Sequence, residues 1–89
     1  MVTLEVVDTL SRLVSMPTVS HRPVIEIAAY LAQRAEDVGF KIHRFETEPG
    51  KINVVALAGP PRSGGLVLSG HMDVVPVTDQ QWTSDPFVL

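Results

Sequence analysis

The chain has 89 residues, enough for one small domain, and a domain of this size buries only about 60 to 65% of its unfolded surface. Its 7 basic and 10 acidic side chains give a net charge of -3 without a basic stripe, which argues against nucleic acid as a partner. Cysteine is absent, which excludes disulfides, thiolate nucleophiles and cysteine zinc knuckles.

The first residues do not resemble an export signal. Glu5 and Asp8 stand where a secretory signal needs an apolar core. No apolar run approaches the roughly 20 residues that a membrane-spanning helix needs. We therefore expect a soluble, cytoplasmic protein with no membrane partner.

The first predicted element is an amphipathic helix over residues 3–15, with Thr3 as its N-cap. Its apolar residues recur at the spacing of a single buried stripe: Val6, Val7, Leu10, Leu13 and Val14. Pro17 should end this helix, because the residue before a proline is pushed out of the helical region. Residues 18–20 then form a connecting loop.

The second predicted helix begins at Pro23, since proline suits the first helical position. Gly39 should end it, because glycine readily takes the left-handed conformation of a helix stop. The apolar stripe of this helix is formed by Val24, Ile27, Ala28, Leu31, Ala35 and Val38. The charged residues on its other face are expected to face solvent.

Three strands are predicted in the second half of the chain. Residues 40–46 and 52–58 are joined by a turn in which Gly50 takes a positive φ, so they form a hairpin. A loop rich in glycine and proline then leads to a third, apolar strand at 66–68. Because residues 52–58 are apolar on both faces, this strand needs cover above and below.

The predicted order of helix, helix and three strands indicates an α/β fold with an incomplete mixed sheet. Two helices cannot cover both faces of strands this apolar. We therefore expect the chain to be the beginning of a larger protein, and we expect the isolated chain to self-associate through its uncovered strands.

A candidate metal site follows the third strand. His71 and Asp73 are two residues apart, so in extended backbone both point to the same side. A neutral imidazole can give one ring nitrogen to a metal while a carboxylate holds the other ring N–H. The alternative is that His71 is a solvated residue or one satisfied within the core, because a lone His-x-Asp pair is common by chance. His21 and His43 are expected to face solvent.

The stretch around this pair resembles a known metal motif. Residues 66–76, Leu-Val-Leu-Ser-Gly-His-Met-Asp-Val-Val-Pro, and residues 82–87, Trp-Thr-Ser-Asp-Pro-Phe, resemble the first metal motif of the two-zinc amidohydrolases. That family includes acetylornithine deacetylase, succinyl-diaminopimelate desuccinylase, aminoacylase and carboxypeptidase G, of which the tail most resembles the first. Residues 17–20 and 53–59 are similar to the opening segments of the same family.

The resemblance implies that residues 1–89 are the N-terminal part of the catalytic domain, with the fold of a zinc-peptidase-like three-layer sandwich. It implies His71 as a zinc ligand and places Asp73 among the catalytic residues as the acidic neighbour that orients it. The complete enzyme would use two zinc ions, with cobalt as the alternative metal, to hydrolyse an acylated amino acid. No other residue matches a family ligand, and the rest would lie beyond Leu89.

The resemblance favours removal of the acetyl group from N2-acetylornithine, in arginine biosynthesis, and the 89 residues alone are expected to be inactive. Desuccinylase or aminoacylase activity of the same family is an alternative. So is a non-catalytic, oligomerising interaction module with the histidine as a relic. A metal-storage or sensing role is disfavoured, because histidine, cysteine and clustered carboxylates are scarce.

Overall fold

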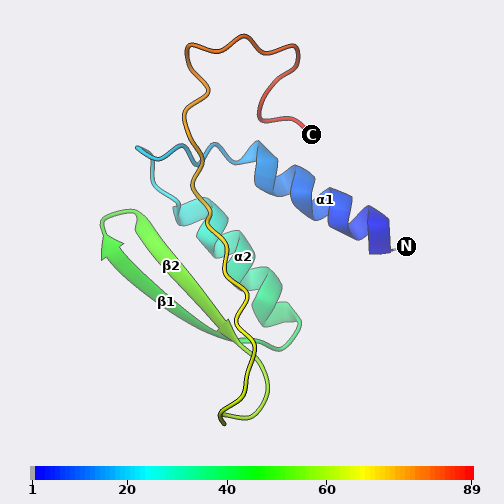
Figure 1. The fold of residues 1–89 in the computed structure, drawn as a ribbon, viewed down its shortest axis with the longest axis vertical. Coiled ribbons are helices and arrows are strands. Elements are labelled where there is room, and N and C mark those ends of the chain that lie inside the picture. Colours follow the sequence, from blue (N-terminus) through cyan, green and yellow to red (C-terminus); the bar gives the residue numbers. More distant parts are fainter. Residues whose placement is uncertain (1) are drawn as a thin grey trace.

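The computed structural model describes residues 2–89, and the side chains from residue 4 onward. It contains two helices and one antiparallel hairpin (Figure 1), with these bounds: α1 Val2–Ser15, α2 Ile25–Asp37, β1 Lys41–Glu48 and β2 Lys51–Leu57. The expected α/β class, both helices and the hairpin are confirmed. The capping role expected of Thr3 lies outside the described side chains.

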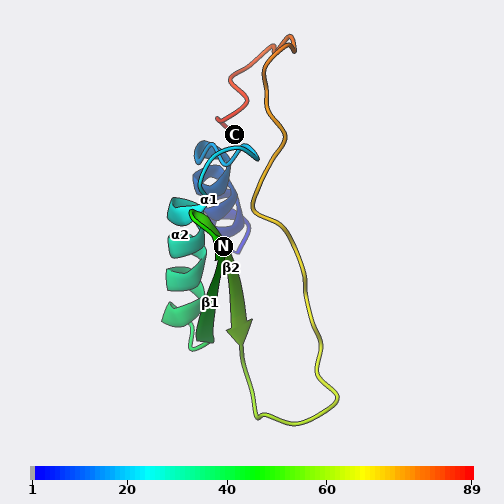
Figure 2. The same cartoon turned by 90° about the vertical axis from the view of Figure 1, so that its left-hand side faces the viewer.

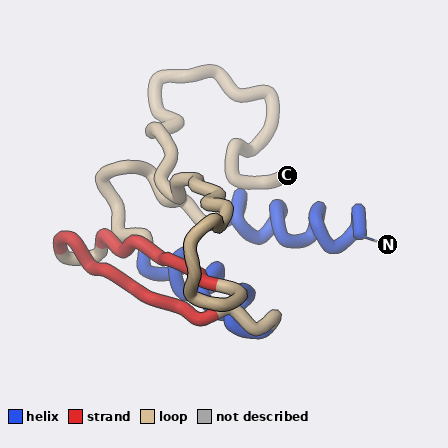
Figure 3. Tube along the Cα trace, turned by 60° about the horizontal axis from the view of Figure 1, so that its bottom comes forward, coloured by secondary structure: helices blue, strands red, loops and turns tan. Residues whose placement is uncertain are grey.

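Helix α1 ends at Ser15, as the proline at position 17 predicted. Its last turn closes when the Met16 N–H donates to the Leu13 carbonyl at 3.2 Å. The buried stripe predicted for this helix is largely wrong, because Val6 and Leu10 are exposed and only Leu13 contacts the core. Figure 3 shows the reason, which is that most of α1 projects beyond α2 and the hairpin.

Helix α2 begins two residues later than predicted. Val24 is its N-cap, because the Val24 N–H is held by the Gly50 carbonyl at 2.8 Å in the hairpin turn. Pro23 therefore precedes the helix. The predicted stop at Gly39 is confirmed: its φ is 97°, and the N–H groups of Gly39 and Phe40 close a Schellman motif on the last turn.

The hairpin pairs Lys41 with Leu57 and Glu46 with Ile52, with an irregularity before the turn. Gly50 has a φ of 80°, which confirms the predicted turn. The face that carries Ile52 packs on α2, where it joins a core formed by Met16, Val24, Ile27, Leu13, Tyr30, Leu31 and Met72. The opposite face exposes large apolar side chains: Phe45, Val55 and Leu57.

The third predicted strand, at 66–68, is not formed. Leu66, Val67 and Leu68 are between 86% and 88% exposed, and this segment pairs with neither β1 nor β2. Figure 2 shows the chain leaving β2, turning, and running back at a distance from the hairpin. A strand needs a partner edge within hydrogen-bonding distance, and the described residues place none beside this segment. The sheet of residues 2–89 therefore has two strands, not three.

The helices of the described part of the chain are short and amphipathic. Neither α1 nor α2, taken within residues 2–89, is long and apolar enough to cross a bilayer.

Candidate metal site

The segment that carries His71 and Asp73 lies against the connector between the helices, where the two cross in Figure 1. Val19 and Val74 form a parallel β-bridge. The Val74 N–H donates to the Thr18 carbonyl at 2.9 Å, and the Ser20 N–H donates to the Val74 carbonyl at 3.0 Å. The connector predicted as an ordinary loop is thus the pairing partner of the candidate motif.

Met72, between the two candidate residues, is anchored inward. Its carbonyl accepts a hydrogen bond of 2.6 Å from the hydroxyl of Thr18, a residue that is only 5% exposed. Its side chain packs against the core. Because side chains alternate along an extended backbone, His71 and Asp73 then point away from the core, and their side chains are 82% and 51% exposed.

The His71 ring is held by Asp73. Its Nδ1 lies 2.7 Å from the Asp73 carbonyl oxygen and 3.3 Å from the carboxylate Oδ1. Both of these oxygens are acceptors, so the geometry favours the neutral tautomer with the proton on Nδ1 and the lone pair on Nε2. This tautomer is the one that a metal ligand needs when its second nitrogen is held by a carboxylate. The predicted proximity of the two side chains is present, and their catalytic and metal-binding roles stay predictions.

Two further residues support this pair from distant parts of the chain. The Ser20 Oγ lies 3.3 Å from the Asp73 Oδ2, and the Lys51 Nζ donates to the carbonyls of Ser20 and Arg22, each at 2.7 Å. Nothing in the sequence pointed to Lys51. The only signal for Ser20 was its place in residues 17–20, which resemble an opening segment of the two-zinc family.

His71 and Asp73 stand at the border of a groove of about 950 Å³. One side of the groove is formed by residues 69–73, and the other by β2 and α2. The candidate site is therefore open to solvent and to ligands.

A second hollow of about 420 Å³ lies between α1 and the end of the chain. Trp82, Pro86 and Phe87 line this hollow together with Leu13 and Met72. The Trp82 Nε1 donates to the Val77 carbonyl at 3.0 Å, which holds the indole over that loop.

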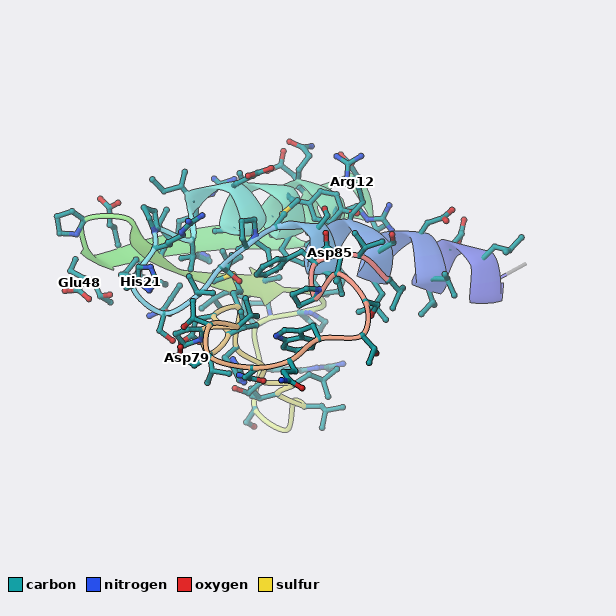
Figure 4. All side chains as sticks on the ribbon, turned by 90° about the horizontal axis from the view of Figure 1, so that it is seen from above. Arg12, His21, Glu48, Asp79 and Asp85 are labelled. Carbon is teal, nitrogen blue, oxygen red and sulfur yellow. The ribbon has the colours of Figure 1, made fainter. Side chains whose placement is uncertain are left out.

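The other histidines are not recruited to the site. His21 and His43 are both exposed, as predicted, and Figure 4 shows His21 at the end of the molecule where the hairpin turns. No group of three or more His, Cys, Asp or Glu side chains within residues 2–89 could hold a metal ion together. The donor set therefore fits one position of a metal site, at His71 Nε2, and not a complete site.

Comparison with known proteins places the chain in a family. No family model and no solved structure matches it. It is similar to acetylornithine deacetylase of Vibrio atlanticus, with 48% identity over 59 residues, 66% of this chain and 15% of that protein. For the enzyme named acetylornithine deacetylase from Vibrio campbellii, identity is 44% over 59 residues, again 66% of this chain and 15% of that protein.

The same name belongs to a protein of Aliivibrio fischeri that is 41% identical over 64 residues, 72% of this chain and 17% of that protein. The chain thus spans about 15 to 17% of the length of these relatives. Several relatives of one name match 66 to 72% of these 89 residues at 41% to 48% identity. We conclude that the chain belongs to the acetylornithine deacetylase family and spans a short part of the length of these members.

Proposed function

We propose that residues 1–89 are the N-terminal part of the catalytic domain of a metal-dependent amidohydrolase that removes the acetyl group from N2-acetylornithine in arginine biosynthesis. The observation that carries this proposal is the His71 ring, which is exposed and has its Nδ1 held by Asp73. Kinship with acetylornithine deacetylases supports the reaction class.

In this proposal His71 binds zinc through Nε2, and Asp73 accepts a hydrogen bond from the Nδ1–H, which keeps the ring in one orientation. Zinc in such a site, or cobalt as the alternative, supplies a water of lowered pKa and a Lewis acid for the acyl carbonyl. The open groove beside His71 admits a small acylated amino acid. Desuccinylase or aminoacylase activity would use the same residues, and the choice among these substrates rests on the names of the relatives.

The isolated chain should lack turnover. One imidazole binds zinc weakly, and residues 2–89 do not bring a second or third ligand to it. The missing ligands and the catalytic acid–base group would come from the part of the family enzyme that these residues do not span. We therefore expect no hydrolysis of N-acetylornithine with added zinc above the level of a His71→Ala control.

A zinc titration followed by NMR of the histidine rings tests the proposed ligand directly. We expect the Nε2 resonance of His71 to shift first and at the lowest zinc concentration, because its tautomer is already set. His21→Ala should leave this response unchanged, since His21 is an exposed loop residue far from the motif in sequence. Equal responses of all three rings, or an unchanged titration in His71→Ala, would refute the ligand assignment.

The exposed strands favour a second candidate, an oligomerising interaction module. Residues 66–68 and the outer face of the hairpin leave apolar side chains in solvent. Exposed, unpaired strand segments are templates for association with another chain. This candidate predicts association that does not depend on metal or on His71, whereas the hydrolase proposal requires His71.

A further inference from the structure

We propose that Ser20 is a positioning residue for the candidate zinc ligand and that it acts through Asp73. The inference rests on the proposed role of His71 as a ligand. It concerns a residue of the connector, on a different element from the motif, that lines the same groove as His71 and Asp73.

The Asp73 carboxylate is held at both of its oxygens. Its Oδ1 lies 3.3 Å from the His71 Nδ1, and its Oδ2 lies 3.3 Å from the Ser20 Oγ. The hydrogen bond of the ring goes to the Asp73 carbonyl at 2.7 Å, and the carboxylate adds a second, longer contact, which rotation about its last torsion would break together with the Ser20 contact. Ser20 therefore limits the freedom of Asp73, which is half exposed and would otherwise turn into solvent.

The Ser20 hydroxyl has one proton and two nearby acceptors. The Val74 carbonyl lies 3.2 Å from the Oγ, but this carbonyl already accepts the Ser20 N–H at 3.0 Å. A hydrogen bond to an ionised carboxylate is roughly twice as strong as one between neutral groups. The proton is therefore directed to Asp73.

The backbone of Ser20 is fixed without its hydroxyl. Its N–H donates to the Val74 carbonyl, and its own carbonyl accepts a hydrogen bond of 2.7 Å from the Lys51 Nζ. The same Nζ also donates to the Arg22 carbonyl. Removing the Oγ should then leave the connector in place and release only the carboxylate. Ser20→Ala therefore tests the contact with Asp73 separately from the backbone of the connector.

The test measures the tautomer of the His71 ring by long-range ¹H–¹⁵N NMR, at a pH where the histidines are neutral. It compares the unmodified protein with Ser20→Ala and Ser20→Thr, all without metal. We expect Ser20→Ala to lower the fraction of the Nδ1–H tautomer without abolishing it, because the Asp73 carbonyl, 2.7 Å from Nδ1, still accepts from it. Ser20→Thr keeps the hydroxyl and should keep the fraction near its original value. Ser15→Ala is the matched control, because the Ser15 Oγ donates to the Arg12 carbonyl at the far end of α1. It should leave His71 unchanged.

A double-mutant cycle shows whether the effect runs through Asp73. In an Asp73→Asn background, Ser20→Ala should change the His71 tautomer no further. In a zinc titration we expect Ser20→Ala to weaken binding at His71 by a few-fold, less than the roughly tenfold or more typical of a partner bound directly to the ligand.

Three results would overturn the inference: an unchanged tautomer in Ser20→Ala, an equal loss in Ser20→Thr, or additive effects in the cycle. The dispersion of the backbone ¹H–¹⁵N spectrum reports whether each variant is folded. Because the tautomer is read without metal, failure of zinc to bind His71 would refute the proposed function and leave the result for Ser20 intact.

Discussion

Val19 and Val74 form a parallel β-bridge, which fastens the connector after α1 to the segment that carries the candidate metal ligand. The hydrogen bonds on either side of the bridge join the connector residues Thr18 and Ser20 to the backbone of Val74. The orientation of His71 thus depends on a segment that precedes it by more than half the length of the chain.

The Thr18 hydroxyl should stabilise this junction. Thr18→Val removes the donor to the Met72 carbonyl and keeps the side-chain shape, so a partly buried acceptor is left without that partner. We expect the free energy of unfolding to fall by about 1 kcal/mol, measured by urea denaturation. Thr47→Val is the control, because the Thr47 hydroxyl is exposed and its bond to Lys51 is long, 3.4 Å. Equal effects of the two substitutions would contradict this role.

Gly50 should tolerate substitution less well than Gly39. Both have a positive φ, which costs a residue with a Cβ about 1 kcal/mol. A Cβ at Gly50 would also lie 3.0 Å from the Pro23 Cβ, whereas one at Gly39 would meet nothing within 4 Å. We expect Gly50→Ala to lower the unfolding free energy by about 1 kcal/mol more than Gly39→Ala. Thermal or urea unfolding of the two variants measures this difference, and its absence would show that the turn can move away from Pro23.

Lys51 should link the hairpin to the connector. Lys51→Met keeps the apolar stem of the side chain and removes the two hydrogen bonds to the carbonyls of Ser20 and Arg22. We expect a loss of about 1 kcal/mol in unfolding free energy, modest because these bonds are exposed to solvent. Lys41→Met, at the exposed start of β1, is the control and should change stability by less than about 0.5 kcal/mol. A neutral Lys51→Met variant would show that the connector does not need this link.

Residues 66–68 should drive any self-association of the chain. Val67→Lys places a charge in the middle of an exposed apolar segment, which opposes pairing between strands. We expect sedimentation velocity to show association of the unmodified chain and a shift toward monomer in Val67→Lys. Val38→Lys changes another exposed valine, at the end of α2, and should leave the association unchanged. A monomeric unmodified chain would refute the expectation.

Local signals were sufficient for the elements themselves. The helix stop at Gly39 and the turn at Gly50 were predicted because a positive φ is a property of single residues and their neighbours. The proximity of His71 to Asp73 was predicted for the same reason, since two residues in extended backbone share a side whatever the rest of the chain does. The start of α2 was misplaced because Val24 is held by a carbonyl of the hairpin turn.

The sequence by itself determined the helices, the hairpin and the paired donor and acceptor of the candidate site, because all of these depend on neighbours within a few residues. Only the tertiary structure decided that Ser20 and Lys51 support the site, and that residues 66–68 stay unpaired. Contacts of this kind join residues roughly 30 to 50 positions apart, so no local pattern records them. Whether an apolar segment becomes a strand depends on a partner edge, and that edge is a property of the folded chain.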